Sequence, residues 1–403
     1  MMDVQPPRVP ARERPVLICT PSLAVGGVER VASCVAEALN AVTPTVLLVE
    51  DSHDAAYDVD PAPLFLPQRT PTERLIWLAQ RAVRRMLWPL VRWSPEPARF
   101  FRFPIDGISD AIRHIDPRVL VLNAQELLYA PELRRRFPHL PIILWLHNSY
   151  DVYFLDYYRP WAHALTRALQ SATCVVALTA IDRLKYGRHA SRCVCIHNPL
   201  TLTVGDAPSD LNTKQICFVG RYSIGHKGID RLVSLAQRLP PGWQIAMAGS
   251  GSPAQVRAVD RLIARARVQD RIVQRGSLQG EALAAHYRSC SAFVMTSRWE
   301  GFPLVLAEAM AAGLPIVAFH NGGSDEILED GRWGMLIEQG DVQTMAAQIN
   351  SLAGDTQLRR YWGQRSLARV QDFTLGPIIQ QWVRLIAEAE SLHGLNAGRS
   401  QTA

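Results

Sequence analysis

The chain has 403 residues, of which 48% are hydrophobic and 20% charged, and it carries a net charge of +6. The length favours two domains over one hydrophobic core, and the composition is that of a globular protein. No apolar run approaches the roughly 20 residues that cross a bilayer, so we expect no membrane-spanning helix. The mild basic charge is a weak indication of an anionic partner, whether a phosphate ligand, a membrane surface or a nucleic acid.

The first apolar run, residues 16–23, is short, and we interpret it as a buried strand and not as a signal peptide. The seven cysteines are scattered along the chain. Cys193 and Cys195 are two apart on a predicted strand, but no second Cys/His pair stands at zinc-site spacing. We therefore expect buried, reduced thiols, no metal or other cofactor, and a cytoplasmic protein.

Short apolar runs alternate with helical patterns along the whole chain, which predicts parallel sheets covered by helices. In the first half we expect strands at residues 16–19, 46–49, 119–122, 142–146 and 174–178, with a helix from residue 28 after the first of them. After a polar linker at 203–214 the pattern restarts. Strands are expected there at 216–219, 244–248, 292–296 and 315–319, and helices at 231–239, 255–266, 304–312 and 377–392.

This periodicity predicts an α/β protein with domains at residues 1–198 and 199–376, followed by a C-terminal helix and tail at 377–403. Two Rossmann-like domains that face each other are expected to hold a ligand in the cleft between them, at the carboxyl ends of their strands.

Residues 69–102 interrupt the alternation, because they are rich in arginine and tryptophan and poor in acids. Their spacing predicts a helix with a broad apolar face and a basic edge. Two interpretations stay open: contact with an anionic membrane surface, which suits Trp and Arg, or a long connection packed on its own domain with solvated arginines.

The segment 297–319 carries the clearest chemical signal. A strand leads into the loop RWEGFP, and an almost wholly apolar helix follows, with Pro303 suited to its first turn and Gly313 to its end. Free amides near Leu304 would form an anion site at the helix N-terminus. Glu308 lies one turn further on the same face, where it could reach a ribose, and Glu300 precedes the helix, where it could meet a sugar.

The E-x7-E segment EGFPLVLAE, residues 300–308, resembles the retaining GT-B glycosyltransferases of family 4, the glycosyl transferases group 1. Further matches cover most of the chain: GGVER at 26–30, WLHNSY at 145–150, IHNPL at 196–200, FVGRYSIGHKGIDRL at 218–232, MAGSGS at 247–252 and GGSDEIL at 322–328. The resemblance implies the GT-B fold, in which an N-terminal acceptor-binding domain and a C-terminal donor-binding domain face across a cleft and the last helix returns to the first domain.

The resemblance also implies roles for individual residues. The catalytic set is His147, Arg221, Lys227 and Glu300. The donor-binding set is Gly26, Gly27, Gly249, Gly251, Phe302, Pro303, Leu304, Val305 and Glu308. The two cations would serve the leaving diphosphate, and His147 would bond the donor sugar. Without the resemblance, surface charges would be the favoured interpretation of Arg221 and Lys227, and a structural role that of His147. The glycine pair at 26–27 would fit a plain turn and a binding loop equally well.

The expected reaction moves a sugar from a nucleotide-sugar, most commonly a UDP-sugar in this family, to a glycan or lipid-linked acceptor of surface polysaccharide or glycolipid synthesis. Front-side attack, in which the leaving phosphate takes the acceptor proton, requires no metal. The single D-x-D, Asp58-Val59-Asp60, lies in a polar loop, and we interpret it as solvated. We expect a cytoplasmic enzyme, with attachment to the inner face of the cytoplasmic membrane left open.

A soluble small-molecule acceptor and a sugar-nucleotide epimerase of the same fold stay as alternatives, although the epimerase is expected to lack the EGFPLVLAE run. A phosphorylase would be much longer and would hold pyridoxal phosphate. Nucleic-acid binding is disfavoured, because the arginines gather in one aromatic-rich stretch and no nucleic-acid motif is present.

Overall fold

The structure is a computed structural model that describes residues 14–24, 26–51, 59–67, 70–91, 96–205 and 209–400, with the side chains of 81, 84, 85, 87–91 and 393–400 left out. The chain divides into two compact units. Unit 1 comprises Met1–Ala177, Arg183–Val194 and Ile379–Ala403, and unit 2 comprises Leu178–Asp182 and Cys195–Ile378.

Unit 1 is built on a parallel sheet of seven strands in the order β3-β2-β1-β4-β5-β6-β7. Its strands are β1 (Val16–Thr20), β2 (Thr45–Val49), β3 (Leu64–Phe65), β4 (Val119–Asn123), β5 (Ile142–Trp145), β6 (Cys174–Ala177) and β7 (Cys193–Cys195). The central strands β1, β4, β5 and β6 are buried throughout. They read as continuous apolar runs because helices cover a parallel sheet on both faces.

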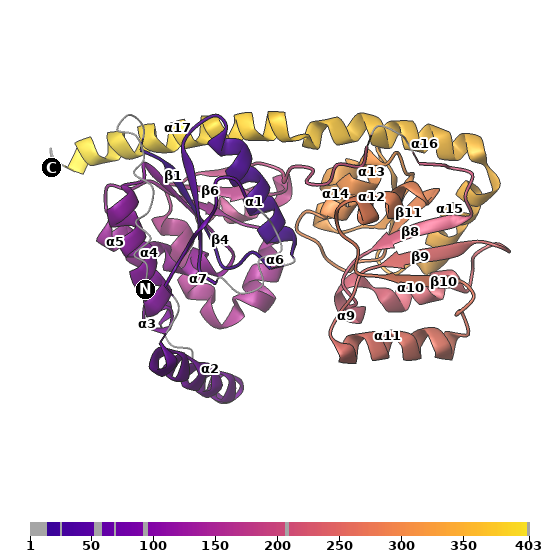
Figure 1. Cartoon of the computed structure of the whole chain (residues 1–403), viewed down its shortest axis with the longest axis horizontal. Coiled ribbons are helices and arrows are strands. Elements are labelled where there is room, and N and C mark those ends of the chain that lie inside the picture. The colour runs from indigo at the N-terminus through magenta and orange to yellow at the C-terminus, as the bar shows by residue number, and fades with distance from the viewer. Residues whose placement is uncertain are drawn as a thin grey trace. The chain divides into compact units, whose positions relative to one another are not determined.

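The helices of unit 1 follow the strands in alternation. They are α1 (Gly27–Asn40), α2 (Pro71–Val91), α3 (Pro97–Phe100), α4 (Arg102–Ile115), α5 (Ala130–Arg136), α6 (Tyr150–Val152) and α7 (Ala162–Ser171), with short turns at Ala124–Tyr129, Tyr153–Tyr157 and Arg159–Trp161; α8 (Ala180–Tyr186) spans the boundary between the units. Figure 1 shows α2 standing out from the rest of unit 1. Only Trp77 of α2 is identified as packing against the core of the unit, among the residues that the structure describes.

Unit 2 is built on a parallel sheet of six strands in the order β10-β9-β8-β11-β12-β13. Its strands are β8 (Gln215–Val219), β9 (Gln244–Ala248), β10 (Ile272–Gly276), β11 (Ala292–Met295), β12 (Ile316–Phe319) and β13 (Met335–Ile337). The chain order reverses between β8 and β11. In a doubly wound sheet, this reversal opens a crevice at the carboxyl ends of the two strands.

The helices of unit 2 are α9 (Ile224–Lys227), α10 (Ile229–Ala236), α11 (Pro253–Ala266), α12 (Gly280–Arg288), α13 (Leu304–Ala311), α14 (Gly322–Leu328), α15 (Val342–Gly354) and α16 (Thr356–Arg369), with a turn at Val370–Phe373. Local sequence sets their ends. Ser252 and Gln255 form a capping box at the start of α11, and Asn321 and Ser324 form another at α14.

The last helix, α17 (Leu375–Ser400), begins in unit 2, and its residues from Ile379 onward belong to unit 1. Trp382 of α17 is fully buried there, with its ring 4.7 Å from that of Trp145 in β5. Arg118, which immediately precedes β4, forms an ion pair of 2.7 Å with Glu390 of the helix.

The predicted fold class is confirmed: both units are parallel, helix-covered sheets, and the C-terminal helix packs on unit 1. The strands predicted from apolar runs are all present, with ends that differ by a residue or so. Three strands had no prediction, namely β3, β10 and β13. They lie at or next to sheet edges, and they are either very short or partly polar, so their patterns are weak. No helix among the described residues is long and apolar enough to cross a membrane.

Candidate functional site

The candidate site of unit 2 lies where the loops after β8 and β11 meet, at the reversal of strand order. The two loops approach closely at Gly228, which has φ +65°, and a Cβ there would come within 2.0 Å of the Thr296 carbonyl oxygen. The Thr296 hydroxyl also donates a hydrogen bond of 2.8 Å to the Lys227 carbonyl. Only glycine fits this junction, and the junction fixes the position of Lys227 against the segment that follows β11.

Lys227 and Glu300, two residues predicted for the site from separate motifs, form an ion pair. The Lys227 ammonium lies 2.6 Å from Glu300 Oε1, and the two side chains are only 13% and 10% exposed. The His226 ring stacks on the Trp299 ring at 4.8 Å, and its Nε2 lies 3.9 Å from Glu300 Oε2. The pair therefore sits in a half-enclosed setting, where charges interact more strongly than at an open surface.

The electrostatics of this pair favour a charged Glu300. Burial raises the pKa of Glu300, but attraction to Lys227 and His226, with hydrogen bonds from Lys227 and Ser297, outweighs burial and leaves the pKa lowered. Burial also lowers the pKa of His226, and the neighbouring Lys227 adds to this effect against the opposing pull of Glu300. Glu300 is thus ionised near pH 7.

Helix α13 follows Glu300 directly, and Pro303 is its N-cap rather than its first helical residue. No side chain of the described residues caps the helix, so the amides of its first turn remain available at its N-terminus. Phe302 and Leu304 are buried, and Val305 is half-buried. The helix ends as predicted, with Gly313 in the left-handed region at φ +71° just after the C-cap residue.

Glu308 lies inside α13 and is 1% exposed. Its Oε2 accepts a hydrogen bond of 2.7 Å from the Tyr287 hydroxyl, which comes from α12. A buried carboxylate needs such partners, and the structure supplies one that the sequence did not indicate. A ribose could reach Glu308 only by displacing groups that now cover it.

The glycine loop GGSDEIL coincides with helix α14, and its second glycine makes a close contact with the Glu300 loop. A Cβ on Gly323 would lie 2.6 Å from Pro303 Cδ and 3.2 Å from Glu300 Cβ. The N-terminus of α14 therefore packs directly against the segment that leads into α13, and Glu300 lies in the chain between Thr296, which meets Gly228, and Pro303, which meets Gly323.

The other predicted residues of unit 2 have different surroundings. Gly249, at φ +139°, lets the loop after β9 pack on the loop after β8, since a Cβ would lie 1.9 Å from the Gly220 carbonyl oxygen. Gly251 is exposed, and a Cβ there would lie 3.1 Å from Tyr222 Cβ. Arg221 is exposed at the end of β8, and its guanidinium has no hydrogen-bond or ion-pair partner within the described part of the chain.

The predicted residues of unit 1 lie at the ends of two of its strands. Gly26 is the N-cap of α1 and Gly27 its first residue; a Cβ on Gly26 would lie 2.1 Å from Glu29 Oε2. His147 follows β5 and is 7% exposed, its ring 4.5 Å from that of Trp145. Neither ring nitrogen has a hydrogen-bond partner among the described residues, and burial lowers the pKa of His147 to about 3.

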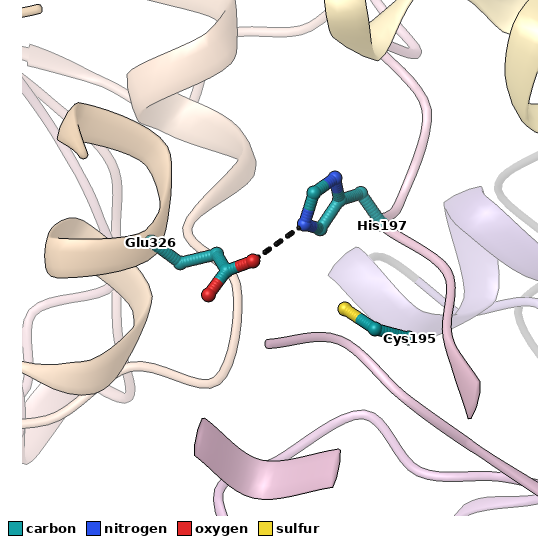
Figure 2. Close-up of side chains that lie close together, drawn as sticks. All are labelled: Cys195, His197 and Glu326. Carbon is teal, nitrogen blue, oxygen red and sulfur yellow. Dashed lines mark hydrogen bonds and ion pairs between the residues drawn. The ribbon is translucent and has the colours of Figure 1, made fainter. Parts of the chain in front are cut away.

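A second polar cluster of unit 2 consists of Cys195, His197 and Glu326 (Figure 2). His197 Nε2 and Glu326 Oε1 are 2.8 Å apart, and the candidate ligand atoms of all three residues lie within 4.8 Å of one another. This is the group of His, Cys, Asp or Glu side chains that could hold a metal ion among the described residues. In Asp58-Val59-Asp60, by contrast, Asp58 lies outside the described residues.

Sequence reasoning missed His226, Trp299 and Tyr287, which surround the two predicted glutamates. His226 adjoins Lys227, so the GHK sequence offered a local hint. Tyr287 precedes Glu308 by 21 positions on another helix, and no spacing rule links them. Such contacts depend on packing between helices, which periodicity does not reveal.

Residues 205–369 match the family model for glycosyl transferases group 1. The chain is similar to an uncharacterized glycosyltransferase of Haemophilus influenzae, with 28% identity over 60% of this chain and 68% of that protein. An exopolysaccharide phosphotransferase of Streptomyces coelicolor is 30% identical over 51% of this chain, which spans only 22% of that longer protein. The solved structure of Anabaena HepE with UDP and glucose aligns with a TM-score of 0.75 at 19% identity, over 93% of this chain and all of that one, which is a likeness of fold.

The matched region holds the Lys227–Glu300 pair, α13 and the glycine loop, and the two parallel-sheet units extend the likeness to most of the chain. Residues 205–369 therefore carry the glycosyl transferases group 1 domain of a glycosyltransferase, and the chain has the GT-B fold.

Proposed function

We propose that the protein transfers a sugar, with retention of configuration, from a UDP-sugar to a glycan or lipid-linked acceptor of surface polysaccharide or glycolipid synthesis. The observation that carries the donor half of this proposal is the Lys227–Glu300 pair, 2.6 Å apart beside the uncapped N-terminus of α13. One side chain suits a phosphate and the other a sugar hydroxyl, at the strand reversal where such folds bind ligands.

The diphosphate is the group that the cations and the helix would serve. Charge builds up on it as the sugar–phosphate bond breaks, and preorganised donors stabilise that charge. We assign to it Lys227, the exposed Arg221 and the amides of Leu304 and Val305 at the start of α13. Gly249 and Gly251 would let the neighbouring loop approach the donor closely.

In the structure Glu300 is paired with Lys227. A diphosphate that draws the ammonium toward itself would weaken this ion pair and leave the Glu300 carboxylate able to accept hydrogen bonds from sugar hydroxyls. The same event would thus prepare both halves of the donor site. Glu308 is assigned to the ribose, which requires the ribose to displace part of its present cover.

Retention fits a front-side reaction, in which the leaving phosphate takes the proton of the acceptor hydroxyl. This step demands charge stabilisation and positioning rather than a protein nucleophile. His147 keeps its predicted role as a hydrogen-bond partner of the donor sugar. Its two unpartnered ring nitrogens support that role, because a buried polar group without a partner suits a bound ligand.

The acceptor half of the proposal draws on the Streptomyces relative, which is named for exopolysaccharide and shares 22% of its length with this chain. A soluble small-molecule acceptor stays the alternative, and products from a panel of acceptors would decide between the two. Epimerase activity would appear instead as an interconverted nucleotide-sugar with no acceptor consumed.

Calorimetric titration with UDP and GDP tests the donor site. We expect UDP binding that falls at least about tenfold in Lys227→Ala and in Glu308→Ala, since each removes a charged contact worth at least ~1.4 kcal/mol. Lys214→Ala and Glu281→Ala, at exposed positions of the same unit, serve as matched controls. Unchanged UDP affinity in both site variants would refute this assignment of residues.

We also propose that α2 binds an anionic membrane surface. Leu75, Leu78 and Met86 fall on one helical face with exposures of 68%, 47% and 64%, and Ile76 and Val83 flank it at 53% and 42%. Trp77 points to the opposite side and packs against the core of unit 1, so the apolar face is turned outward. Arg81, Arg84 and Arg85, whose side chains lie outside the described residues, belong to the same helix.

Co-sedimentation with phosphatidylserine vesicles tests this surface. Vesicle binding should weaken in the double variant Leu75→Ser/Met86→Ser, which removes apolar contact. It should also weaken when Arg81, Arg84 and Arg85 are all changed to Gln, and vesicle binding by this variant should no longer depend on salt concentration. Val42→Ser, at a position that is 62% exposed elsewhere in unit 1, is the matched control. Equal sedimentation of all variants would show that α2 is not the contact.

A further inference from the structure

The cluster of Cys195, His197 and Glu326 is not used by the proposed transfer reaction, and it brings three different metal-ligating groups together. Cys195 ends β7, His197 follows it by two residues, and Glu326 comes from α14, 129 positions after His197 in the chain. All three side chains are half-buried, and Figure 2 shows them converging from two separate ribbon segments.

We propose that Cys195, His197 and Glu326 form a binding site for Zn²⁺. A thiolate, an imidazole and a carboxylate are the ligands that this borderline-soft cation takes in proteins. Hard cations such as Mg²⁺ prefer oxygen ligands alone, so the thiol and imidazole argue against them. Three protein ligands leave the fourth tetrahedral position for water or another exchangeable group.

The geometry requires only small movements of side chains. Zinc–ligand bonds of about 2.0 to 2.3 Å place tetrahedral ligand atoms about 3.3 to 3.7 Å apart. The His197 Nε2–Glu326 Oε1 distance of 2.8 Å must therefore open by less than ~1 Å. The ligand atoms lie within 4.8 Å of one another, so the widest separation must close by about 1 Å. The cation takes the place of the proton that His197 and Glu326 now share.

The surroundings already orient the ligands, as outer partners do in metal sites. Glu326 Oε2 accepts a hydrogen bond of 2.9 Å from the Ala180 amide, which leaves Oε1 directed at His197. The His197 ring stacks on Phe302 at 5.3 Å and meets Phe373 edge-on at 5.5 Å. These contacts hold the imidazole plane, so little conformational freedom is lost when a cation binds.

The site would join two parts of unit 2 that have no covalent link nearby. Cys195 and His197 belong to the segment that enters unit 2 from β7, and Glu326 belongs to α14. The N-terminus of α14 packs on the Glu300 loop through Gly323, and Phe302 of that loop stacks on His197. A bound cation would thus pin the entering segment to the helix and loop that border the proposed donor site.

Cobalt substitution tests the proposal directly. Tag-free protein, stripped with EDTA, is titrated with Co²⁺ under reducing conditions, and the thiolate-to-cobalt charge-transfer band is recorded. We expect the band to saturate at equimolar Co²⁺ and to disappear when Zn²⁺ is added. Cys195→Ser should abolish it, while Cys193→Ser, two residues away on the same strand, should keep it. Glu326→Gln should lower the Zn²⁺ affinity at least about tenfold.

Circular dichroism and the melting temperature without metal show whether each variant folds, so that loss of metal binding is separated from loss of structure. Absence of the band in the parent protein, its persistence in Cys195→Ser, or its equal loss in Cys193→Ser would each overturn the site. The readout does not involve nucleotide or sugar, so its failure leaves the proposed transfer reaction untouched, and the reverse also holds.

Discussion

The burial of His147 predicts how the stability of the protein depends on pH, without involving any substrate. The perturbation is His147→Phe, which keeps an aromatic ring beside Trp145 and removes the titratable group. Among the described residues neither ring nitrogen of His147 has a hydrogen-bond partner, and burial lowers its pKa from 6.5 to about 3. In the unfolded chain the imidazole can take up a proton freely, so acid favours unfolding.

The magnitude follows from linkage between proton uptake and unfolding. A depressed pKa in the folded state contributes stability that is fully present above the unfolded pKa of 6.5 and is lost as the pH falls toward the folded value of about 3. Between pH 7 and pH 5 the unfolded imidazole becomes almost fully charged while the folded one stays neutral. The parent protein should therefore lose about 2 kcal/mol through His147 over this interval.

Urea unfolding at pH 7, 6 and 5, followed by tryptophan fluorescence, measures this loss. Hydrogen exchange of peptides that cover β5 assigns it to unit 1. His147→Phe should lose about 2 kcal/mol less than the parent between pH 7 and pH 5. His163→Phe, at an exposed position of unit 1, is the control for the added ring. If His147→Phe and the parent lose stability equally, the imidazole is not buried and neutral as described.

Three further predictions concern Glu126, Gly249 and the Lys227–Glu300 pair. Burial and a neighbouring carboxylate raise the pKa of Glu126 well above its ordinary value of 4.5. The stability that protonated Glu126 contributes at low pH is therefore lost as the pH rises above about 4.5. Glu126→Gln should make the free energy of unfolding in urea depend less on pH above that value, and it should stabilise unit 1 at pH 7. Gly249→Ala should destabilise unit 2 by about 3 kcal/mol or more in thermal unfolding, because the added Cβ would overlap the backbone. Gly354→Ala, where the added Cβ would meet no atom, should be nearly neutral or mildly stabilising. Equal effects of the two changes would contradict the packing described. Lys227→Met should lower the free energy of unfolding by about 3 kcal/mol, because it leaves Glu300 unpaired. In a double-mutant cycle, adding Glu300→Gln should restore most of this loss. Additive losses would show that the ion pair is not formed.

The fold was largely predictable because parallel strands buried on both faces give unbroken apolar runs. Residues 244–248 illustrate this, since the predicted strand and β9 coincide. Strand order within each sheet was not predictable from these runs, because equivalent apolar segments can occupy any central position. The short edge strand β13 was not predicted, because three residues are too few to show the alternation of a strand.

The candidate site was predictable to the extent that its residues are adjacent in the chain. Glu300, α13 and the glycine loop were recognised because they lie in short motifs. The pairing of Lys227 with Glu300 spans 73 positions, and it depends on the Gly228–Thr296 junction that only the folded backbone reveals. The Cys195 cluster was not predicted, because its third member is a glutamate on a helix far along the chain. The usual sequence spacing of zinc sites consists of two Cys/His pairs, and the second pair is missing here.

The division of α17 between the units has a consequence for synthesis on the ribosome. Trp382 completes the core of unit 1 beside Trp145, yet it is translated after the whole of unit 2. Unit 2 is nearly continuous in sequence and can therefore close its sheet first, although it comes second in the chain. Unit 1 must wait with an incomplete core until the last helix emerges, so a stalled or truncated chain would present that unfinished surface to chaperones and proteases.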